Sequence, residues 1–260
     1  GTAMTELLRR ILPTVQKPAR YTGGEYNEIK KDLGDVRVRV AFCFPDTYEI
    51  GMSNVGMRIL YGVMNEMDGV WCERVFAPWD DMEEQMRKNN IPLYALESGD
   101  PIKDFDIIGF TLQYELCYTN VLNMLDLAGL PVKAKDRHSL SPIVMGGGPC
   151  VCNPEPVAEF FDLFSLGEGE EVNSEIMDLY KKHKKMGSTK EEFLIEAAKI
   201  EGVYVPSLYD ITYNEDGTVK EIKPLHGAPE TVTKRIIKEL DKVEYPESFV
   251  VPYIDVVHDR

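Results

Sequence analysis

The sequence has no long run of apolar residues. Hydrophobic residues make up 43% of its 260 positions, yet no stretch approaches the about 20 consecutive apolar residues of a membrane-spanning helix. The start of the chain also lacks the charged and apolar regions of a secretory signal peptide. We therefore expect a cytoplasmic protein with no membrane partner.

Positive charge is scarce as well. The chain has 29 Lys and Arg residues against 44 Asp and Glu residues, which gives a formal net charge of -15. A surface of this charge repels the phosphate groups of nucleic acids, and the sequence contains no large basic cluster that would overcome the repulsion. Nucleic acid is therefore not an expected partner.

The five cysteines are odd in number and scattered, which does not suggest a disulfide framework. Only Cys150 and Cys152 are close in sequence, and a tetrahedral zinc site usually needs a second such pair. We expect reduced thiols and no metal site. The five residues are Cys43, Cys72, Cys117, Cys150 and Cys152.

The hydrophobic pattern divides the chain into three parts. Residues 1–34 predict a short helix and an extended lead-in, whereas residues 35–186 alternate strand patterns with helix patterns. Residues 187–260 predict an appendage with a hairpin. The alternation predicts an α/β fold with a doubly wound, mostly parallel sheet of the Rossmann-like or flavodoxin-like class, followed by a small α+β appendage.

Two strand patterns support this fold most directly. Residues 36–40 (VRVRV) alternate apolar and charged side chains, which is typical of a strand with one solvated face. Residues 106–112 (DIIGFTL) are almost continuously apolar, as in parallel strands buried on both faces. Residues 93–96 predict a further short strand, and Asp216-Gly217 predicts the turn of the hairpin.

Residues 51–67 predict a helix with one apolar face. The spacing of its apolar residues is that of successive helical turns, so we expect this face to lie in the core. The residues expected there are Val55, Ile59, Leu60, Val63 and Met67.

Three turns are candidates for a binding site, because ligands of open parallel sheets bind beyond the carboxyl ends of the strands. Residues 45–56 contain glycines and lead into a helix, whose first N–H groups can bind an anion. Residues 111–115 are mostly polar, and residues 146–148 are three glycines that leave the backbone uncovered. Taken alone, these residues serve equally well as turns or helix caps.

The order of the three turns resembles that of cobalamin (B12)-binding domains. Residues 46–51 (DTYEIG) match both ends of the pattern D-x-H-x-x-G, residues 111–113 (TLQ) are similar to S-x-L, and Gly146-Gly147 match a glycine pair. Residues 144–170 carry V-x-G-G, P-E, D and G-E-G-E in a series similar to the B12-binding portion of radical SAM proteins. The chain thus resembles the N-terminal, cobalamin-binding-like domain of B12-type radical SAM proteins.

This resemblance implies a corrinoid site. Its residues would be Asp46, Tyr48, Gly51 and Ser53 on one side, Thr111 and Gln113 as the floor, and Gly146, Gly147 and Gly148 as a shelf. Tyr48 stands where the family has its cobalt-ligating histidine, and a neutral phenol with a pKa near about 10 is a poor substitute for imidazole. The resemblance therefore implies cobalamin bound without a lower protein ligand, or no cobalamin.

The four histidines lie outside the turns that match the family, so we expect each to be a surface or structural residue. They are His138, His183, His226 and His258.

The sequence has no C-x3-C-x2-C motif, which radical SAM proteins use to bind a 4Fe-4S cluster. The resemblance places the cluster and S-adenosylmethionine in a C-terminal radical SAM barrel of the same parent chain, expected after residue 260. This barrel is the expected partner, and residues 1–260 are not expected to catalyse the radical reaction alone.

Three hypotheses for the function follow. The first is an accessory domain that presents a corrinoid to the radical site or shapes access to that site. The second is a scaffold that has lost the corrinoid and contacts the barrel through residues 187–260. The third, a separate Rossmann-type enzyme, needs an acid–base pair; Asp46 and Glu49 share one loop, but exposed carboxylates are usually only solvated.

Overall fold

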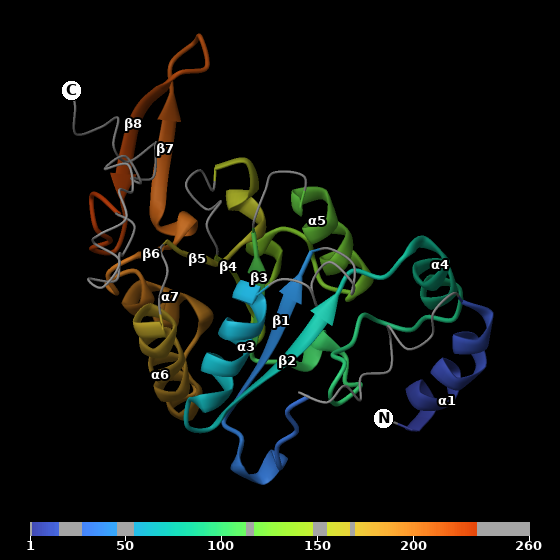
Figure 1. Ribbon diagram of the computed structural model, residues 1–260. Helices are drawn as coiled ribbons and strands as arrows, with labels where there is room; N and C mark the ends of the chain where they lie inside the picture. The colour runs from blue at the N-terminus through green and yellow to red at the C-terminus, as the bar shows by residue number, and fades with distance from the viewer. Residues whose placement is uncertain are drawn as a thin grey trace. The chain divides into compact units, whose positions relative to one another are not determined.

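The computed structural model describes residues 2–15, 28–45, 55–112, 117–147, 155–166 and 170–232 (Figure 1). The chain divides into two compact units, Gly1–Val132 and Lys133–Arg260. Six strands make up a mostly parallel sheet, with the order β2-β1-β3 in the first unit and β4-β5-β6 in the second. The predicted α/β fold of the Rossmann-like or flavodoxin-like class is confirmed, while the predicted boundaries at residues 34 and 186 stay predictions.

Three parallel strands form the sheet of the first unit. The central strand β1 pairs on one side with β2 and on the other with β3, so that Val40 lies opposite both Cys72 and Ile107. All three strands are almost entirely buried. Their bounds are Val38–Phe44 for β1, Val70–Phe76 for β2 and Ile107–Thr111 for β3.

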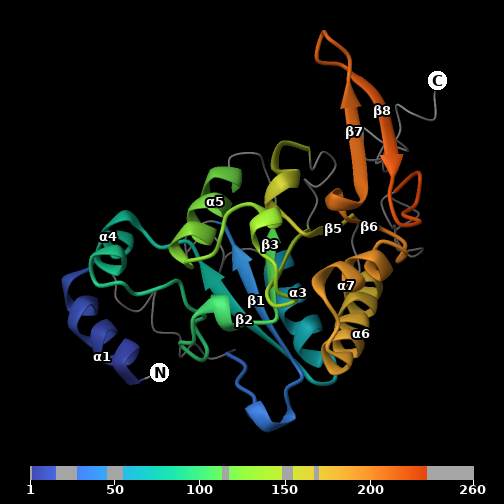
Figure 2. The same ribbon diagram turned by 180° about the vertical axis from the view of Figure 1, so that it is seen from behind.

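Helices cover both faces of these three strands. Figure 1 shows α3 in front of the strands, and Figure 2, seen from behind, shows α5 in front of them. This is the doubly wound arrangement expected from the sequence. The helices of the unit are α1 (Thr2–Ile11), α3 (Val55–Glu66), α4 (Asp80–Lys88) and α5 (Cys117–Leu127), and its 3-10 turns are η1 (Leu12–Thr14), η3 (Leu33–Asp35) and η4 (Ile102–Asp104).

The second unit contains the strands β4, β5 and β6 and the predicted hairpin. Strand β5 pairs in parallel with β4 and antiparallel with β6. Helix α7 begins with a capping box formed by Thr189 and Glu192. The elements are η5 (Ala134–Asp136), β4 (Ile143–Gly147), η6 (Glu155–Phe160), β5 (Leu163–Ser165), α6 (Glu170–Met186), α7 (Lys190–Ala197), β6 (Val203–Tyr204), η7 (Pro206–Leu208), β7 (Tyr209–Tyr213) and β8 (Val219–Pro224).

The strand predicted at residues 93–96 does not form. Only Tyr94 makes an isolated bridge, with Pro101. The chain turns back at once, since the amide of Ala95 donates to the carbonyl of Asp100 (3.0 Å). The segment instead lies beside β2, where the amide of Leu96 donates to the carbonyl of Arg74 (3.0 Å).

The buried face of α3 differs from the predicted one. Ile59 has 60% of its surface exposed, while Met57, Tyr61, Met64 and Asn65 are buried. Asn65 can be buried because its side-chain amide is hydrogen-bonded to the backbone of β2. Its Oδ1 accepts from the amide of Cys72 (2.8 Å), and its Nδ2 donates to the carbonyl of Cys72 (3.0 Å). The prediction was wrong for Ile59, whereas Leu60, Val63 and Met67 are half-buried. The core side chains Met57, Tyr61 and Met64 follow an equally good helical spacing (i, i+4, i+7), so the apolar pattern alone did not decide between the two faces.

The charged side of β1 is also enclosed rather than solvated. The guanidinium of Arg39 lies over the ring of Phe105 (4.3 Å to its centre) and bonds to Glu73 (2.6 Å) and Asp100 (2.9 Å). Glu73 is fully buried, and this burial raises its pKa despite the hydrogen bonds from Ser98 and Arg39. Arg39 therefore belongs to a largely buried ion network, whereas Arg37, just before β1, is exposed as the alternation of VRVRV predicts.

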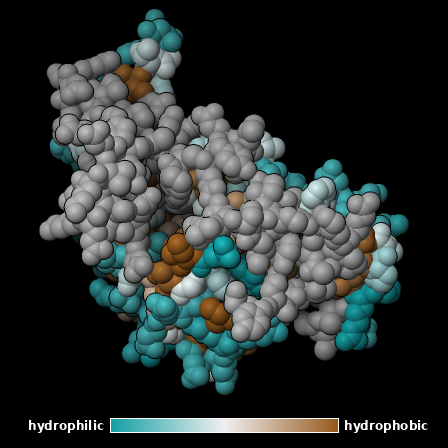
Figure 3. All heavy atoms as spheres, in the orientation of Figure 1, coloured by the Kyte–Doolittle hydropathy of each residue, from teal (hydrophilic) through white to brown (hydrophobic). Residues whose placement is uncertain are grey.

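Within the described part of the chain, no helix has the length and apolar composition to cross a membrane. Hydrophilic residues dominate the described surface on the face shown in Figure 3, as expected from the excess of charged residues. Cys43 and Cys72 are buried free thiols, and burial raises the pKa of both.

Candidate functional site

Three of the sequence-predicted site residues lie in the described parts of the chain. Thr111 is the last residue of β3, and Gly146 and Gly147 end β4, so each lies at the carboxyl end of a parallel strand. The positions agree with the rule for ligand sites in such sheets. The remaining six, Asp46, Tyr48, Gly51, Ser53, Gln113 and Gly148, lie outside the described residues.

Thr111 has a buried hydroxyl group. The residue is 9% exposed, and its Oγ1 has no hydrogen-bond partner among the residues that the structure describes. Leaving a buried hydroxyl unsatisfied costs about 1–3 kcal/mol. A hydrogen bond from this hydroxyl to a bound group or an ordered water would remove that cost.

The loop after β1 is tied to the helix that follows β3. Asn120, in the first turn of α5, donates to the carbonyl of Pro45 (2.9 Å). This bond fixes the start of the loop that contains the first predicted motif. The first unit thus holds the ends of β1 and β3 in a set position.

Gly147 has an uncovered backbone. It lies opposite Ser165 of β5, and a Cβ added to it would lie 3.8 Å from the Cβ and from the carbonyl oxygen of Ser165, an ordinary van der Waals distance. Among the described residues, packing therefore gives no reason for glycine at this position. Close approach of a flat ligand to the backbone does give one.

Asp162 fixes the strand that carries Gly146 and Gly147. Its backbone amide donates to the carbonyl of Val144 (2.8 Å), and its carboxylate accepts from the amide of Val144 (2.8 Å). The aspartate of the family-like series thus holds β4 beside β5. It acts on the glycines through the backbone.

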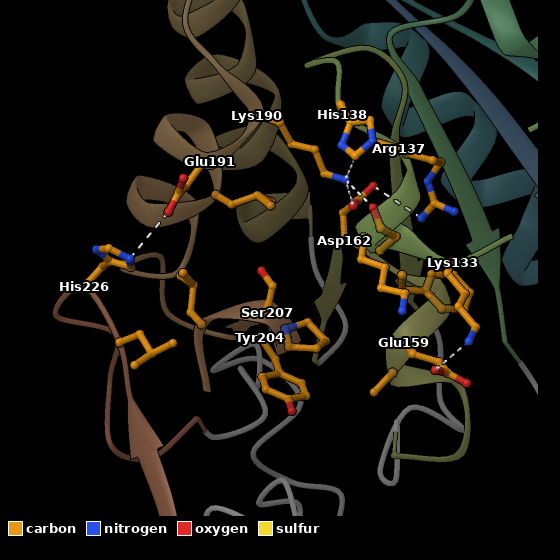
Figure 4. A pocket seen from close by; sticks show the side chains of 18 of the residues that line it. Lys133, Arg137, His138, Glu159, Asp162, Lys190, Glu191, Tyr204, Ser207 and His226 are labelled. Atoms are coloured by element: carbon orange, nitrogen blue, oxygen red, sulfur yellow. Dashed lines mark hydrogen bonds and ion pairs between the residues drawn. The ribbon is translucent and has the colours of Figure 1, made fainter. Parts of the chain in front are cut away.

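Two cations hold the Asp162 carboxylate, as Figure 4 shows. The ammonium group of Lys190 forms an ion pair with Oδ1, and a guanidinium nitrogen of Arg137 lies 3.6 Å from Oδ2. All three side chains are largely buried. Burial lowers the pKa of Arg137, and the neighbouring Asp162 opposes that shift.

Sequence reasoning missed Arg137 and Lys190. Lys190 offered a signal, because it occupies the first position of α7, where the helix dipole disfavours a cation. Such a lysine needs a compensating anion, and Asp162 is that anion. Arg137 lies in a turn and offered no comparable signal.

Two histidines have the structural roles expected for them. His183 is 2% exposed; its Nδ1 bonds to Ser188 (2.7 Å) and its Nε2 to Glu196 (3.0 Å). His226 lies 3.4 Å from Glu191. His138 is exposed at the surface, and His258 lies outside the described residues.

The sequence model of a protein family, the N-terminal domain of radical SAM proteins, matches residues 56–206. The match covers more than half of the chain and includes Thr111, Gly147 and Asp162. The chain belongs to this family. The resemblance to radical SAM proteins is thereby confirmed, whereas specificity for B12 stays a prediction.

This radical SAM N-terminal domain also has a relative in Methanocaldococcus jannaschii, the uncharacterized protein MJ0966. The two are 32% identical over 132 residues, which are 50% of this chain and 24% of the relative. The matched region thus spans about a quarter of the relative's length. No solved structure matches the chain.

Proposed function

We propose that this radical SAM N-terminal domain is an accessory domain that binds a corrinoid at the carboxyl ends of its parallel strands. It would present the corrinoid to a radical SAM barrel of the same parent chain or shape access to the radical site there. The observation that carries the proposal is the buried, unsatisfied hydroxyl of Thr111. The cluster and S-adenosylmethionine would belong to the barrel.

The described residues fit a corrinoid in two respects. A corrin is broad and flat, and glycine at the half-buried position 147 places no side chain between the backbone and such a surface. The corrin also carries amide groups around its rim, and the Thr111 hydroxyl can donate to an amide oxygen. A bound corrinoid would supply cobalt chemistry, while these residues bind and orient it.

The missing histidine restricts the mode of binding. Tyr48 occupies the position of the lower ligand, so we propose that cobalamin binds without a ligand from this chain. Thr111, the three glycines and residues 46–53 would then hold the corrin by contacts alone.

A scaffold without a cofactor is the second candidate. It is favoured by Tyr48, which stands where the family has its cobalt-ligating histidine. In this case the barrel would be the partner.

The test is a titration of the chain with hydroxocobalamin and with cob(II)alamin, followed by visible absorption. Saturable binding with the spectrum of base-off cobalamin supports the proposal if Thr111→Val and Gly147→Phe weaken it. The exposed Thr212→Val is the matched control and should bind like the unchanged chain. If no binding is seen up to about 1 mM cobalamin, the binding free energy is weaker than about 4 kcal/mol. That result would overturn the corrinoid proposal and leave the scaffold as the function.

A further inference from the structure

The second unit contains a cavity of about 870 Å³ (Figure 4). Small-molecule sites usually have volumes of about 300–1,000 Å³. The cavity is lined by residues of η5, η6 and α7, by residues between β6 and the middle of β7, and by Leu225 and His226 just after β8. None of the residues proposed for the corrinoid lines it, so it is a separate candidate site.

The buried ions at one wall of the cavity are occupied by the protein itself. Lys190 directs its ammonium group to three oxygens, namely Asp162 and the carbonyls of Ala134 (3.0 Å) and Arg137 (2.8 Å). Arg137 donates to the carbonyl of Phe160 (2.6 Å). These bonds hold η5 and η6 in place, and a ligand would have to break them to use either cation.

Two other basic side chains line the cavity and do not bind groups of the protein in this way. Among the described residues, the side chains of Lys135 and His138 have no hydrogen-bond or ion-pair partner, and both residues are exposed. Lys133 is only weakly engaged, 4.0 Å from Glu159. The cavity therefore offers cationic groups that can pair with a ligand.

The charge around the cavity contrasts with that of the whole chain. Its lining contains four Lys and Arg residues against three Asp and Glu residues, and two histidines in addition. The whole chain has a net charge of -15. The lining thus has a formal excess of one positive charge, with the histidines taken as neutral, in a chain that is strongly acidic overall.

Another part of the lining is apolar and comes partly from the hairpin. Register places Ile211 opposite Ile222 and Tyr209 opposite Pro224, so these residues share one face of the two-stranded ribbon. The other face pairs Asp210 with Lys223. Ile211 lines the cavity together with three leucines, Leu194, Leu208 and Leu225.

We propose that this cavity binds a small organic anion with an apolar body and one carboxylate, sulfonate or phosphate group. Lys135 and His138 pair with the charged group, while the ribbon face around Ile211 contacts the body. Size, local charge and the apolar wall each point to this class. The inference does not depend on whether the domain binds a corrinoid.

The test uses two fluorescent probes with the same aromatic rings. One, 1-anilinonaphthalene-8-sulfonate, is an anion, and the other, N-phenyl-1-naphthylamine, is its neutral analogue without the sulfonate. We expect one saturable site per chain for the anion and weaker binding of the neutral probe. Raising the salt concentration from about 50 mM to about 500 mM should weaken the binding of the anionic probe and leave the binding of the neutral probe unchanged.

Matched variants locate the site. Lys135→Glu should raise the dissociation constant of the anionic probe at least about threefold and leave the neutral probe unchanged. Lys220→Glu makes the same charge change on β8, away from the cavity lining, and should have no effect. Ile211→Glu should weaken both probes, and Thr212→Glu, on the other face of the same strand, should weaken neither.

Three results would overturn the proposal. They are an equal effect of Lys135→Glu and Lys220→Glu, binding of the neutral probe as tight as the anion, and several weak sites in place of one. Should Ile211→Glu disturb folding, seen by circular dichroism, the exposed Lys135→Glu and the neutral probe still decide the question.

Discussion

Replacing Asp162 by Asn tests whether its charge organises the second unit. Asn keeps nearly the same shape and keeps an oxygen that can accept from the amide of Val144. The change therefore removes the negative charge and little else. Lys190 and Arg137, with 12% and 3% of their side chains exposed, would remain as buried cations without their anion.

The expected loss follows from this burial. Removing one partner of a buried ion pair usually destabilises a protein by about 3–5 kcal/mol. The lower end applies here, because Lys190 keeps two backbone carbonyls as partners. We expect Asp162→Asn to lower the free energy of unfolding of the second unit by about 3 kcal/mol.

The assay must report on the second unit. Both tryptophans, Trp71 and Trp79, belong to the first unit, so tryptophan fluorescence would miss the change. Urea unfolding followed by circular dichroism gives the free energy, and amide hydrogen exchange in β4 and β5 locates the loss.

An exposed aspartate provides the control. Asp178 has 73% of its side chain exposed and lies 3.6 Å from Lys181, so Asp178→Asn should change stability by less than about 0.5 kcal/mol. The double variant Asp162→Asn with Lys190→Met should lose less than the sum of the two single variants. If Asp162→Asn costs no more than Asp178→Asn, the buried ion cluster does not hold β4 beside β5 and the reasoning fails.

Three further predictions concern single groups. Thr111→Val should stabilise the ligand-free first unit by about 1–2 kcal/mol, because it removes an unsatisfied buried hydroxyl. Urea unfolding monitored by tryptophan fluorescence measures this gain. A loss of stability, or an equal gain in the exposed Thr119→Val, would contradict the prediction. Gly147→Ala should change stability by less than about 0.5 kcal/mol, whereas Gly129→Ala, at φ +77°, should cost about 1–2 kcal/mol in thermal unfolding; equal costs would contradict the difference in backbone geometry. Burial raises the pKa of Tyr209 to about 12, so the unfolded chain, with a tyrosine pKa of about 10, loses this proton first. The stabilising contribution is therefore present below pH about 10 and is lost as the pH rises toward about 12. Ultraviolet titration of tyrosinate should lose one high-pH group in Tyr209→Phe, and an unchanged titration curve in this variant would contradict the assignment.

Local patterns were sufficient to predict most of the elements. Residues 106–112 predict β3 because a buried parallel strand needs apolar side chains on both faces. The Asp216-Gly217 pair predicts the hairpin because its turn needs a left-handed residue, and Gly217 has φ +85°. In both cases the information lies within a few consecutive residues.

Long-range pairing of polar groups explains what the sequence did not reveal. Glu73 and Arg74 lie in the middle of the fully buried strand β2. No hydrophobic pattern predicts that these two charged side chains are buried. Each is satisfied by residues distant in sequence: Arg39 bonds to Glu73, and Glu97 accepts from both the backbone amide (2.8 Å) and the side chain (2.6 Å) of Arg74. A single sequence contains the members of such pairs but not their pairing.

The same distinction applies to the candidate site. The glycines at residues 146 and 147 could be found from sequence, because absence of a side chain is a local property that a motif records. The residues that hold them could not, because Asp162 acts through Val144 and is itself held by Lys190, which follows it by 28 positions. A motif therefore indicates where a ligand can approach the backbone, and the buried ions hold the strand that carries these glycines in position. Cobalamin binding that survives in Asp162→Asn but is lost in Gly147→Phe would separate these two contributions.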